Sequence, residues 1–420
     1  MPVPPPESTT TPARGRPAAL SPGGRPWLRR LVRVAIGLLA VVAVAVAVFV
    51  VATRNPTPGA FYEPPDDLSG PAGTVMRSEP FEHGLPDGAR AWRVLYTSTD
   101  DDGDPIAVSG LIVAPTDPTG GPHPVLAWAH GTTGIARPCA PSLTDNPLAG
   151  IPDMAAPLEQ GWVVALTDYP GLGTPGPHPY LGGASAGRAV LDSVRAAHDL
   201  DTGMDLSDEY AIWGHSQGGH AALFAGQLAE DHLSDQDLAG VVALAPATRL
   251  VDNFEALQGT QIGNVLTILA VDSWSAYYPE LSTDILTPDL RRRAGRMGRD
   301  CLNQPSRFRL LLAGLRLPRT ITVRDVTDDP AWSARLDENT PDPAGMAAPL
   351  LVEVGLADEV IAPAVTRGWV EDRCATGAAT QWTARDGVDH LDIVGPGGTD
   401  ALAWTVDRFD GAPAPNRCPG

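Results

Sequence analysis

A serine at position 216 has the local sequence that a nucleophilic hydroxyl group requires. A short apolar segment at 210–213 is followed by Gly-His-Ser-Gln-Gly at 214–218 and then by a helix-like run at 221–225. A strand that turns sharply into a helix, with serine at the corner and glycine two residues to either side, is typical of a nucleophile elbow. Glycine at the flanks avoids collisions in the strained turn. We therefore predict that Ser216 is a nucleophile.

A second stretch has the same spacing and provides an internal comparison. Residues 183–187 (GASAG) precede a helix-like run at 189–200, but the residues before them, 171–181, form a loop rich in Pro, Gly and His with no strand pattern. Serine in that context is typical of a helix N-terminus, where it caps the first turn. The sequence therefore favours Ser216 over Ser185 as the nucleophile.

A nucleophilic serine needs a base that accepts its proton. In folds with this elbow, the chain order is serine, then acid, then histidine. His390 is the only histidine after residue 232, and it follows a predicted strand at 381–384. We predict that His390 is the base. Other histidines have no place in that order and are predicted to be structural: His130, His178, His198, His215 and His220.

The acid that orients the base is expected between the serine and the histidine. Asp358 lies on the loop that follows the apolar strand predicted at 350–354. Glu359 is the neighbouring alternative. Asp386 and Asp389 are less favoured because they share the loop of the histidine, which would have to curl back. We predict that Asp358 is the acid.

The negative charge that develops on a substrate carbonyl needs two backbone N–H donors, one after the nucleophile and one on the loop after the third strand. These requirements indicate Gln217 and, in the loop His-Gly-Thr-Thr-Gly at 130–134, Thr132 or Thr133. This chemistry requires no metal and no cofactor.

Short apolar strands alternate with amphipathic helices over most of the chain. This alternation predicts an α/β fold with a mostly parallel sheet covered by helices on both faces. A polar turn at 100–104 indicates that the first two strands form an antiparallel hairpin. Ligands of such sheets bind at the carboxyl ends of the strands, where the candidate residues fall. The predicted strands are 92–98, 108–114, 124–129, 162–166, 210–213, 241–244, 350–354 and 381–384.

About 100 residues, 249–348, separate the sixth and seventh of these strands and contain helical patterns at 264–275 and 306–316. An insert at this point would stand over the elbow, so we predict a helical cap. Its apolar side chains either line an acyl pocket or form the core of the cap itself, and the sequence leaves both open. These side chains are Phe254, Leu266, Trp274, Tyr277 and Tyr278.

The N-terminal part of the chain is predicted to lie outside the folded domain. Residues 1–33 are rich in Pro, Ser, Thr and Arg, and are expected to be a disordered cytoplasmic tail. Residues 34–53 are apolar enough to cross a membrane, and the arginines before them place the N-terminus in the cytoplasm. A cleaved signal sequence is the alternative, and it would give a secreted protein. Residues 54–88 are expected to be a linker, and residues 89–420 the α/β domain.

The charge and the cysteines restrict the environment and the partners. The chain carries −20, and residues 1–33 hold six Arg and one Glu, so the remainder carries −25. Because this negative charge repels phosphate groups, we do not expect nucleic acid to be a partner. The four cysteines are widely spaced, without a metal-binding pattern, and fit disulfide bonds in an oxidising compartment, although they can pair in three ways.

The chain contains the motifs GTTG (131–134), CAPS (139–142), DYPGLG (168–173), HPYL (178–181) and GHSQGG (214–219). Together they resemble the secretory lipase family, the α/β-hydrolases that include fungal lipases of the lipase A type. The resemblance spans roughly residues 73–409. The elbow is a general feature of α/β-hydrolases, whereas the segments CAPS and DYPGLG are fairly specific to the family. One difference is that the fungal members have an Asp in the oxyanion loop, where this chain has HGTTG.

The resemblance implies a carboxylic-ester hydrolase with a helical cap, acting on a small-molecule or lipid ester. It also implies a triad that matches Ser216, Asp358 and His390. The disulfides of the family would match Cys139 with Cys301 and Cys374 with Cys418. Two other classes stay open: an exopeptidase or cell-envelope acyl esterase on the same fold, and a non-catalytic binding protein tethered to a membrane.

Overall fold

The computed structural model describes residues 1, 3–4, 26–148, 150–151 and 153–420. They form two compact units, residues 1–52 and 53–420. Most of the tail expected to be disordered lies outside the described residues. The apolar segment forms helix α1 (Pro26–Ala52), which begins before the predicted boundary at residue 34 and includes Arg29, Arg30 and Arg33. Its 27 residues correspond to a length of about 40 Å, enough to cross a bilayer.

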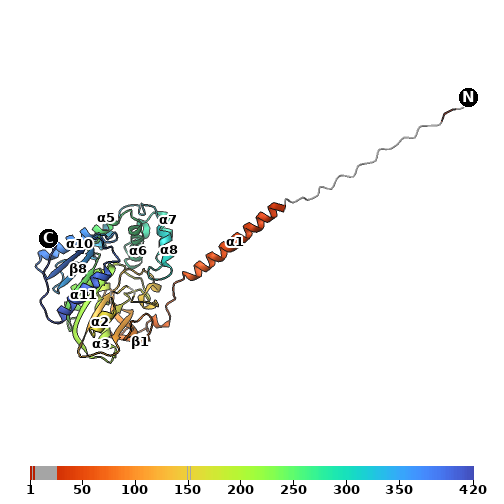
Figure 1. Ribbon diagram of the computed structural model, residues 1–420. Helices are drawn as coiled ribbons and strands as arrows, with labels where there is room; N and C mark the ends of the chain where they lie inside the picture. The colour runs from red at the N-terminus through yellow and green to blue at the C-terminus, as the bar shows by residue number, and fades with distance from the viewer. Residues whose placement is uncertain (2, 5–25, 149, 152) are drawn as a thin grey trace. The chain divides into compact units, whose positions relative to one another are not determined.

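The described part of the second unit contains a nine-stranded sheet in the order β1-β2-β3-β5-β4-β6-β7-β8-β9 (Figure 1). The pairs β1–β2, β2–β3 and β3–β5 are antiparallel, and all other neighbours are parallel. The α/β fold with a mostly parallel sheet is thus confirmed, including the hairpin of β2 and β3. The strands are β1 (Val75–Phe81), β2 (Ala89–Thr99), β3 (Pro105–Pro115), β4 (His123–Ala129), β5 (Val163–Thr167), β6 (Leu206–His215), β7 (Asp237–Leu244), β8 (Leu350–Gly355) and β9 (Thr380–Arg385).

Helices cover both faces of the sheet, and for this reason the central strands are apolar at successive positions. In β4, Ala127 packs into the core under one set of helices, whereas Leu126 and Trp128 pack into the core on the other face. The first core receives side chains from α3 (Gly183–Asp199), α4 (Gln217–His232) and α10 (Pro363–Ala375). The second core receives them from α2 (Ala155–Glu159) and α11 (Val394–Phe409).

The insert between β7 and β8 forms the predicted helical cap, with a hydrophobic core of its own. Asn339, at the end of the last cap helix, ties the cap to the sheet domain. Its Oδ1 accepts a 2.7 Å hydrogen bond from the N–H of Gly183 in α3, and its carbonyl accepts a 2.7 Å hydrogen bond from Nε2 of His220 in α4. The cap helices are α5 (Leu250–Leu257), α6 (Gln261–Tyr277), α7 (Pro288–Met297), α8 (Arg307–Gly314) and α9 (Pro330–Glu338).

Part of the predicted linker is folded, so that prediction is wrong for these residues. Strand β1 lies inside 54–88 and pairs with β2 along the edge of the sheet. Ahead of it, Tyr62 is only 2% exposed, and its hydroxyl lies 2.9 Å from Oγ of Ser142. The folded unit therefore begins well before residue 89.

Two disulfide bonds among the described residues match the pairing that the family resemblance implies. Cys139 and Cys301 join the segment after β4 to the cap, and Cys374 and Cys418 join α10 to the C-terminal segment. The first bond fixes the cap over the carboxyl ends of the strands.

Candidate active site

Ser216 lies at the corner between β6, which ends at His215, and α4, which begins at Gln217. Its backbone has a φ of +59°, in the region that side chains other than glycine rarely occupy, so the turn is strained. The flanking glycines are required by close backbone contacts. A Cβ on Gly214 would lie 2.0 Å from the carbonyl oxygen of Gly218, and one on Gly218 would lie 1.9 Å from that of Ala129. The geometry is that of a nucleophile elbow.

Ser185 occupies a different setting. It is buried in the first turn of α3, after the N-cap residue Gly182, and follows a loop rather than a strand. The prediction that Ser185 caps the helix is therefore wrong, because the N-cap position is occupied by Gly182. Its hydroxyl is buried without a hydrogen-bond partner among the described residues.

His390 connects Ser216 to Asp358. Its Nε2 lies 2.9 Å from Oγ of Ser216, and its Nδ1 lies 2.6 Å from Oδ2 of Asp358. A carboxylate only accepts hydrogen bonds, so the proton between His390 and Asp358 is on Nδ1 of the imidazole. Nε2 is then free to accept the proton of the serine hydroxyl. The other oxygen of Asp358 accepts hydrogen bonds from the N–H groups of Val360 and Ile361, at 2.7 and 2.8 Å.

The side chains of Glu359, Asp386 and Asp389 form no hydrogen bond to His390 among the described residues. Asp389 uses its Oδ1 to accept from the N–H groups of Leu391 and Asp392, within its own loop. The chain brings Asp358 rather than Asp386, Asp389 or Glu359 to the imidazole.

The loops that hold the acid and the base are joined by main-chain hydrogen bonds. The N–H of Leu356 donates to the carbonyl of Arg385, and the N–H of Ala357 to that of Val388, both at 2.9 Å. A Cβ on Gly355 would lie 2.2 Å from the carbonyl oxygen of Val388, so glycine is required where the loops meet. This contact fixes the separation of Asp358 and His390.

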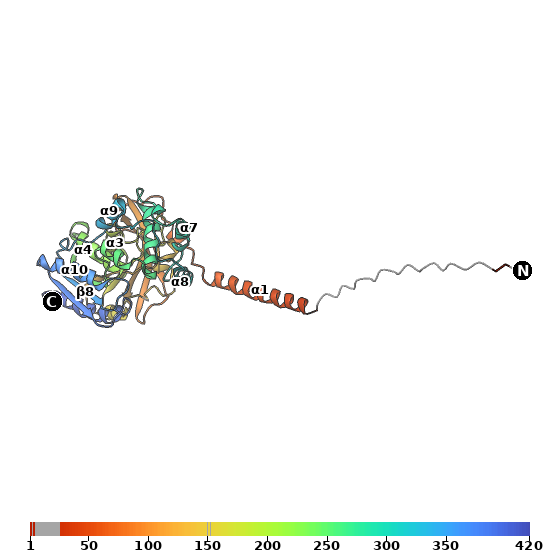
Figure 2. The same ribbon diagram turned by 90° about the horizontal axis from the view of Figure 1, so that it is seen from above.

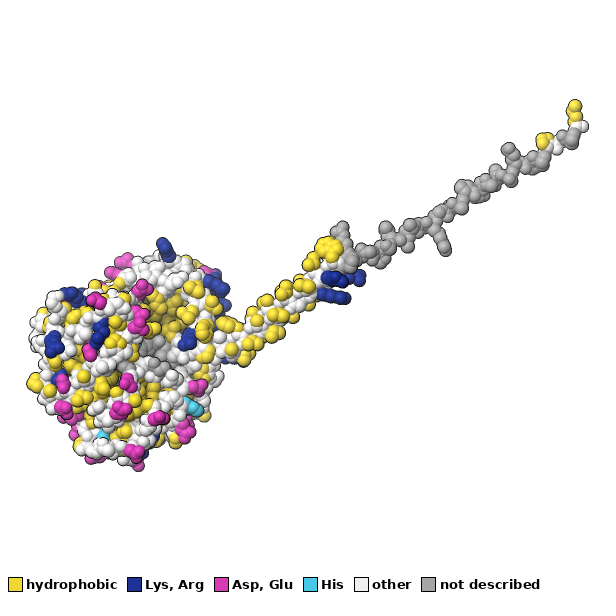
Figure 3. Space-filling view, in the orientation of Figure 1, with side chains coloured by type: hydrophobic (Ala, Val, Ile, Leu, Met, Phe, Trp, Pro, Cys, Tyr) yellow, Lys and Arg dark blue, Asp and Glu magenta, His cyan; other side chains and the backbone are white. Residues whose placement is uncertain are grey.

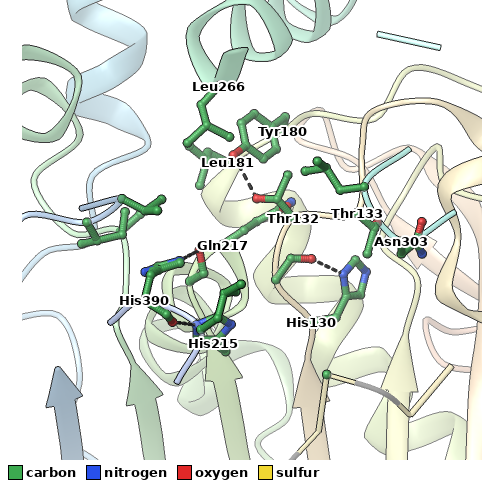
Figure 4. A pocket seen from close by; sticks show the side chains of 18 of the residues that line it. His130, Thr132, Thr133, Tyr180, Leu181, His215, Gln217, Leu266, Asn303 and His390 are labelled. Atoms are coloured by element: carbon green, nitrogen blue, oxygen red, sulfur yellow. Dashed lines mark hydrogen bonds between the residues drawn. The ribbon is translucent and has the colours of Figure 1, made fainter. Parts of the chain in front are cut away.

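The candidate oxyanion residues surround the same space as Ser216. Gln217 is the first residue of α4, where backbone N–H groups point out of the helix without partners in the helix. Thr132 and Thr133 follow β4, and both line the cavity that contains Ser216. Figure 4 shows Thr132 and Gln217 in the same region above the strand ends, with the Thr132 hydroxyl facing Tyr180 at 3.0 Å.

The motifs behind the family resemblance meet in a buried polar network beneath this space, which the sequence did not reveal. Asp168 of DYPGLG accepts hydrogen bonds from the hydroxyls of Ser109 and Ser142, and from the N–H of Ser142 at 2.9 Å. Burial raises the pKa of Asp168. His178 of HPYL donates from Nδ1 to the carbonyl of Pro170, and its Nε2 accepts from the Gln217 side chain at 3.1 Å.

Burial also affects the other histidines near the site. It lowers the pKa of His178, His215 and His220 to about 4, because the interior disfavours the charged imidazolium. The pKa of His130 is lowered for the same reason. These histidines are neutral at pH 7.

A cavity of about 650 Å³ opens beside Ser216, and apolar side chains from both the cap and the sheet domain line most of it. Figure 3 shows hydrophobic side chains gathered around a hollow on one face of the folded unit. The sequence did not decide which apolar cap residues line the pocket and which form the core of the cap. In the structure, Phe254 and Leu266 line the cavity. Trp274 and Tyr278 belong to the core of the cap, and Tyr277 packs against that core. The insert therefore supplies both a pocket and its own core.

The comparison with protein families agrees with this geometry. The model of the family described as secretory lipase matches residues 151–417. The chain belongs to the secretory lipase family. The family and its relatives among the lipases and esterases identify it as a carboxylic-ester hydrolase, as the motifs predicted.

Three of these similar proteins cover most of the chain. Lipase A of Arthroderma benhamiae is 26% identical over 86% of this chain and 81% of its own length. A probable inactive lipase of Mycobacterium tuberculosis is 25% identical over 85% and 83%. The closed state of Candida antarctica lipase A superposes with a TM-score of 0.73 at 21% identity, covering 88% of this chain and 90% of that one. The last comparison supports the fold alone.

Proposed function

We propose that this secretory lipase hydrolyses acyl esters through a covalent acyl-enzyme formed on Ser216, with His390 as general base and Asp358 as its orienting acid. The observation that supports the proposal is the continuous chain of hydrogen bonds from Ser216 Oγ through His390 to Asp358. A serine hydroxyl becomes an effective nucleophile when a positioned base can take its proton during attack.

In the first step, Oγ of Ser216 attacks the ester carbonyl carbon while its proton moves to Nε2 of His390. Asp358 stabilises the resulting imidazolium through Nδ1–H. The carbonyl oxygen becomes an oxyanion, which the N–H groups of Gln217 and of Thr132 or Thr133 would bind. The imidazolium then gives its proton to the leaving alcohol oxygen, and the acyl group stays on Ser216.

In the second step, water attacks the acyl-enzyme while His390 accepts one water proton. The tetrahedral intermediate collapses, the proton returns to Oγ, and the carboxylic acid is released. Each backbone donor of the oxyanion contributes about 10²- to 10³-fold to such a reaction.

The proposed substrates are esters with an apolar acyl chain. The cavity next to Ser216 is lined by side chains such as Leu250, Phe254, Leu257 and Leu266, which offer apolar contact and no charge to an acyl group. Burial of each acyl CH₂ in such a site contributes about 0.8 kcal/mol. We therefore expect kcat/KM to rise with acyl length until the cavity is filled.

A fluorophosphonate probe tests the nucleophile in the full-length protein. We expect one covalent adduct on the peptide that contains Ser216, in the wild type and in the matched variant Ser185→Ala. The variant Ser216→Ala should show no adduct, and its hydrolysis of p-nitrophenyl esters should fall by about 10⁶-fold. Because one relative is named as a probable inactive lipase, the absence of an adduct in the folded wild type is an informative result, and it would overturn the proposal.

A chain-length series of p-nitrophenyl esters, run beside aminoacyl p-nitroanilides, tests the substrate class. We expect turnover of the esters alone. Faster cleavage of the anilides would instead favour an exopeptidase.

The disulfides and the family favour a location outside the cytoplasm for the folded unit. We propose that α1 stays attached as a membrane anchor. An apparent mass that includes residues 26–52 in the membrane fraction would support this proposal, and a released form that begins after residue 52 would indicate a signal sequence.

A further inference from the structure

Positive charge is concentrated in one part of the cap. The segment 288–319, which contains α7 and α8, holds nine Arg and two Asp and carries +7, although residues 53–420 hold 24 Arg and 49 acidic residues and carry −25. Exposed arginines of this segment, such as Arg296, Arg316 and Arg319, form no salt bridge in the described part of the chain. Both views place α7 and α8 at the same edge of the folded unit (Figures 1 and 2).

Exposed apolar side chains lie among these charges on α8 and directly after it. Phe308, Leu311, Leu312 and Leu315 are 49, 55, 44 and 65% exposed, while Leu310 points into the core of the cap. One side of α8 thus holds the helix on the cap, and the other presents large hydrophobic groups to the surroundings. A helix with this division and a basic border is typical of proteins that bind at the surface of an anionic membrane.

The same face borders the cavity beside Ser216. Leu311 and Arg307 of α8 line that cavity, and so does Ile262 of α6, although all three are exposed. Side chains that are both exposed and part of the cavity wall lie at its mouth. A surface that binds α8 would therefore lie next to the entrance for an ester.

The beginning of the folded unit is attached to this part of the cap. The side-chain N–H of Asn55 donates to the carbonyl of Arg299 at 2.7 Å, and Arg309 donates to the hydroxyl of Thr53 at 3.4 Å. Thr53 directly follows the apolar helix α1 in the sequence. The polypeptide therefore enters the folded unit beside α7 and α8, and the chain connects this part of the cap directly to α1.

We propose that the face made by α7, α8 and Leu315 binds an anionic phospholipid surface, with the hydrophobic groups of α8 in the headgroup region and the arginines near lipid phosphates. The charge of the face and the attachment of Thr53 and Asn55 favour a bilayer over a second copy of the chain. A second copy would bring a surface of +7 against another of +7. The proposal rests on the proposed role of α1 as a membrane anchor, and it does not depend on catalysis.

The test uses the full chain in nanodiscs of phosphatidylcholine, with or without phosphatidylglycerol. An environment-sensitive fluorophore is attached to Leu315→Cys and quenched by spin-labelled lipids. The described chain has no free cysteine, so this thiol is the labelling site. We expect a blue shift and quenching in discs with phosphatidylglycerol and at least five-fold less quenching in phosphatidylcholine alone or in high salt. Each arginine removed in Arg316→Gln and Arg319→Gln should weaken binding by about five-fold.

The matched control is the same fluorophore on Ala403→Cys, an exposed position of α11, which packs on the sheet rather than in the cap. This label should not respond to the lipid. Equal quenching at Leu315→Cys in all lipid mixtures, or equal quenching at both positions, would overturn the proposal. A blue shift that appears only with two chains per disc and without lipid quenching would indicate a second copy as the occupant, and would also overturn it.

Discussion

The main-chain carbonyl of His390 accepts a 2.8 Å hydrogen bond from Nε2 of His215, the residue directly before Ser216. The candidate base is thus attached to the elbow at two points, through its own side chain and through its backbone. Because burial lowers the pKa of His215 to about 4, this imidazole is neutral and donates through Nε2–H at physiological pH. His215 therefore positions the base without exchanging a proton in the reaction.

Replacing His215 should impair the geometry of the base rather than remove it. We expect His215→Phe to lower kcat on a soluble ester by about 10-fold. A decrease of this size corresponds to the free energy of one lost buried hydrogen bond. His215→Gln keeps an N–H donor near the same place and should recover most of the loss. Wild-type kcat in the Phe variant, or an equal loss in both variants, would contradict this positioning role.

The elbow glycines should be intolerant of even one methyl group. We expect Gly218→Ala to destabilise the protein by more than about 3 kcal/mol, because its Cβ would lie 1.9 Å from the carbonyl oxygen of Ala129. Gly395→Ala is the matched control, since a Cβ there meets nothing within 4 Å and its position in α11 favours Ala over Gly. Thermal unfolding should show a large decrease for the first variant and no decrease for the second.

The sequence was sufficient for the parts of the fold with strong periodic signals. Central strands such as β4 and β5 are short apolar runs because helices cover both faces, and they were found within a few residues of their bounds. Strand β1 was missed because it lies at the edge of the sheet, includes Pro80, and is mostly half-exposed. Tyr62 was missed because a single buried aromatic residue in a Pro-rich segment has no periodicity.

The candidate site could be predicted where chain order restricts the choice, and not where packing decides it. Asp358 and His390 follow Ser216 in the required order, and the structure places them within hydrogen-bond distance. Whether a cap residue lines the cavity or belongs to the core of the cap depends on which side of α6 faces the cavity. The sequence pattern does not determine that orientation. The network around Asp168 joins residues far apart in the chain, and only its motifs gave a signal.

The disulfides should differ in their contribution to stability. Cys139 and Cys301 are separated by 162 residues and Cys374 and Cys418 by 44, so the first bond restricts the unfolded chain more. We expect Cys139→Ser/Cys301→Ser to lower the free energy of unfolding by roughly 1 kcal/mol more than Cys374→Ser/Cys418→Ser. Urea unfolding of the two double variants measures the difference, and a larger loss for the second would contradict it.

Glu353 should make the protein less stable as the pH rises from about 5 to 8. This residue of β8 is fully buried, and only one of its oxygens has a partner in the described chain, the guanidinium of Arg385 at 3.1 Å. Burial raises its pKa from 4.5 to about 7, although Arg385 opposes the shift. The folded state therefore holds this proton more tightly than the unfolded state, and the associated stability is complete below about pH 4.5 and lost as the pH passes 7.

The change from pH 5 to 8 should reach roughly 2.5 kcal/mol in the free energy of unfolding. Glu353→Gln cannot ionise and should lack this part of the pH dependence, so that its stability relative to wild type increases with pH. Glu371→Gln, on the exposed side of α10, serves as the control and should follow the wild type. Urea unfolding of the three proteins between pH 5 and 8 in the same detergent provides the comparison. Parallel curves for wild type and Glu353→Gln would show that the buried carboxyl is ionised throughout this range.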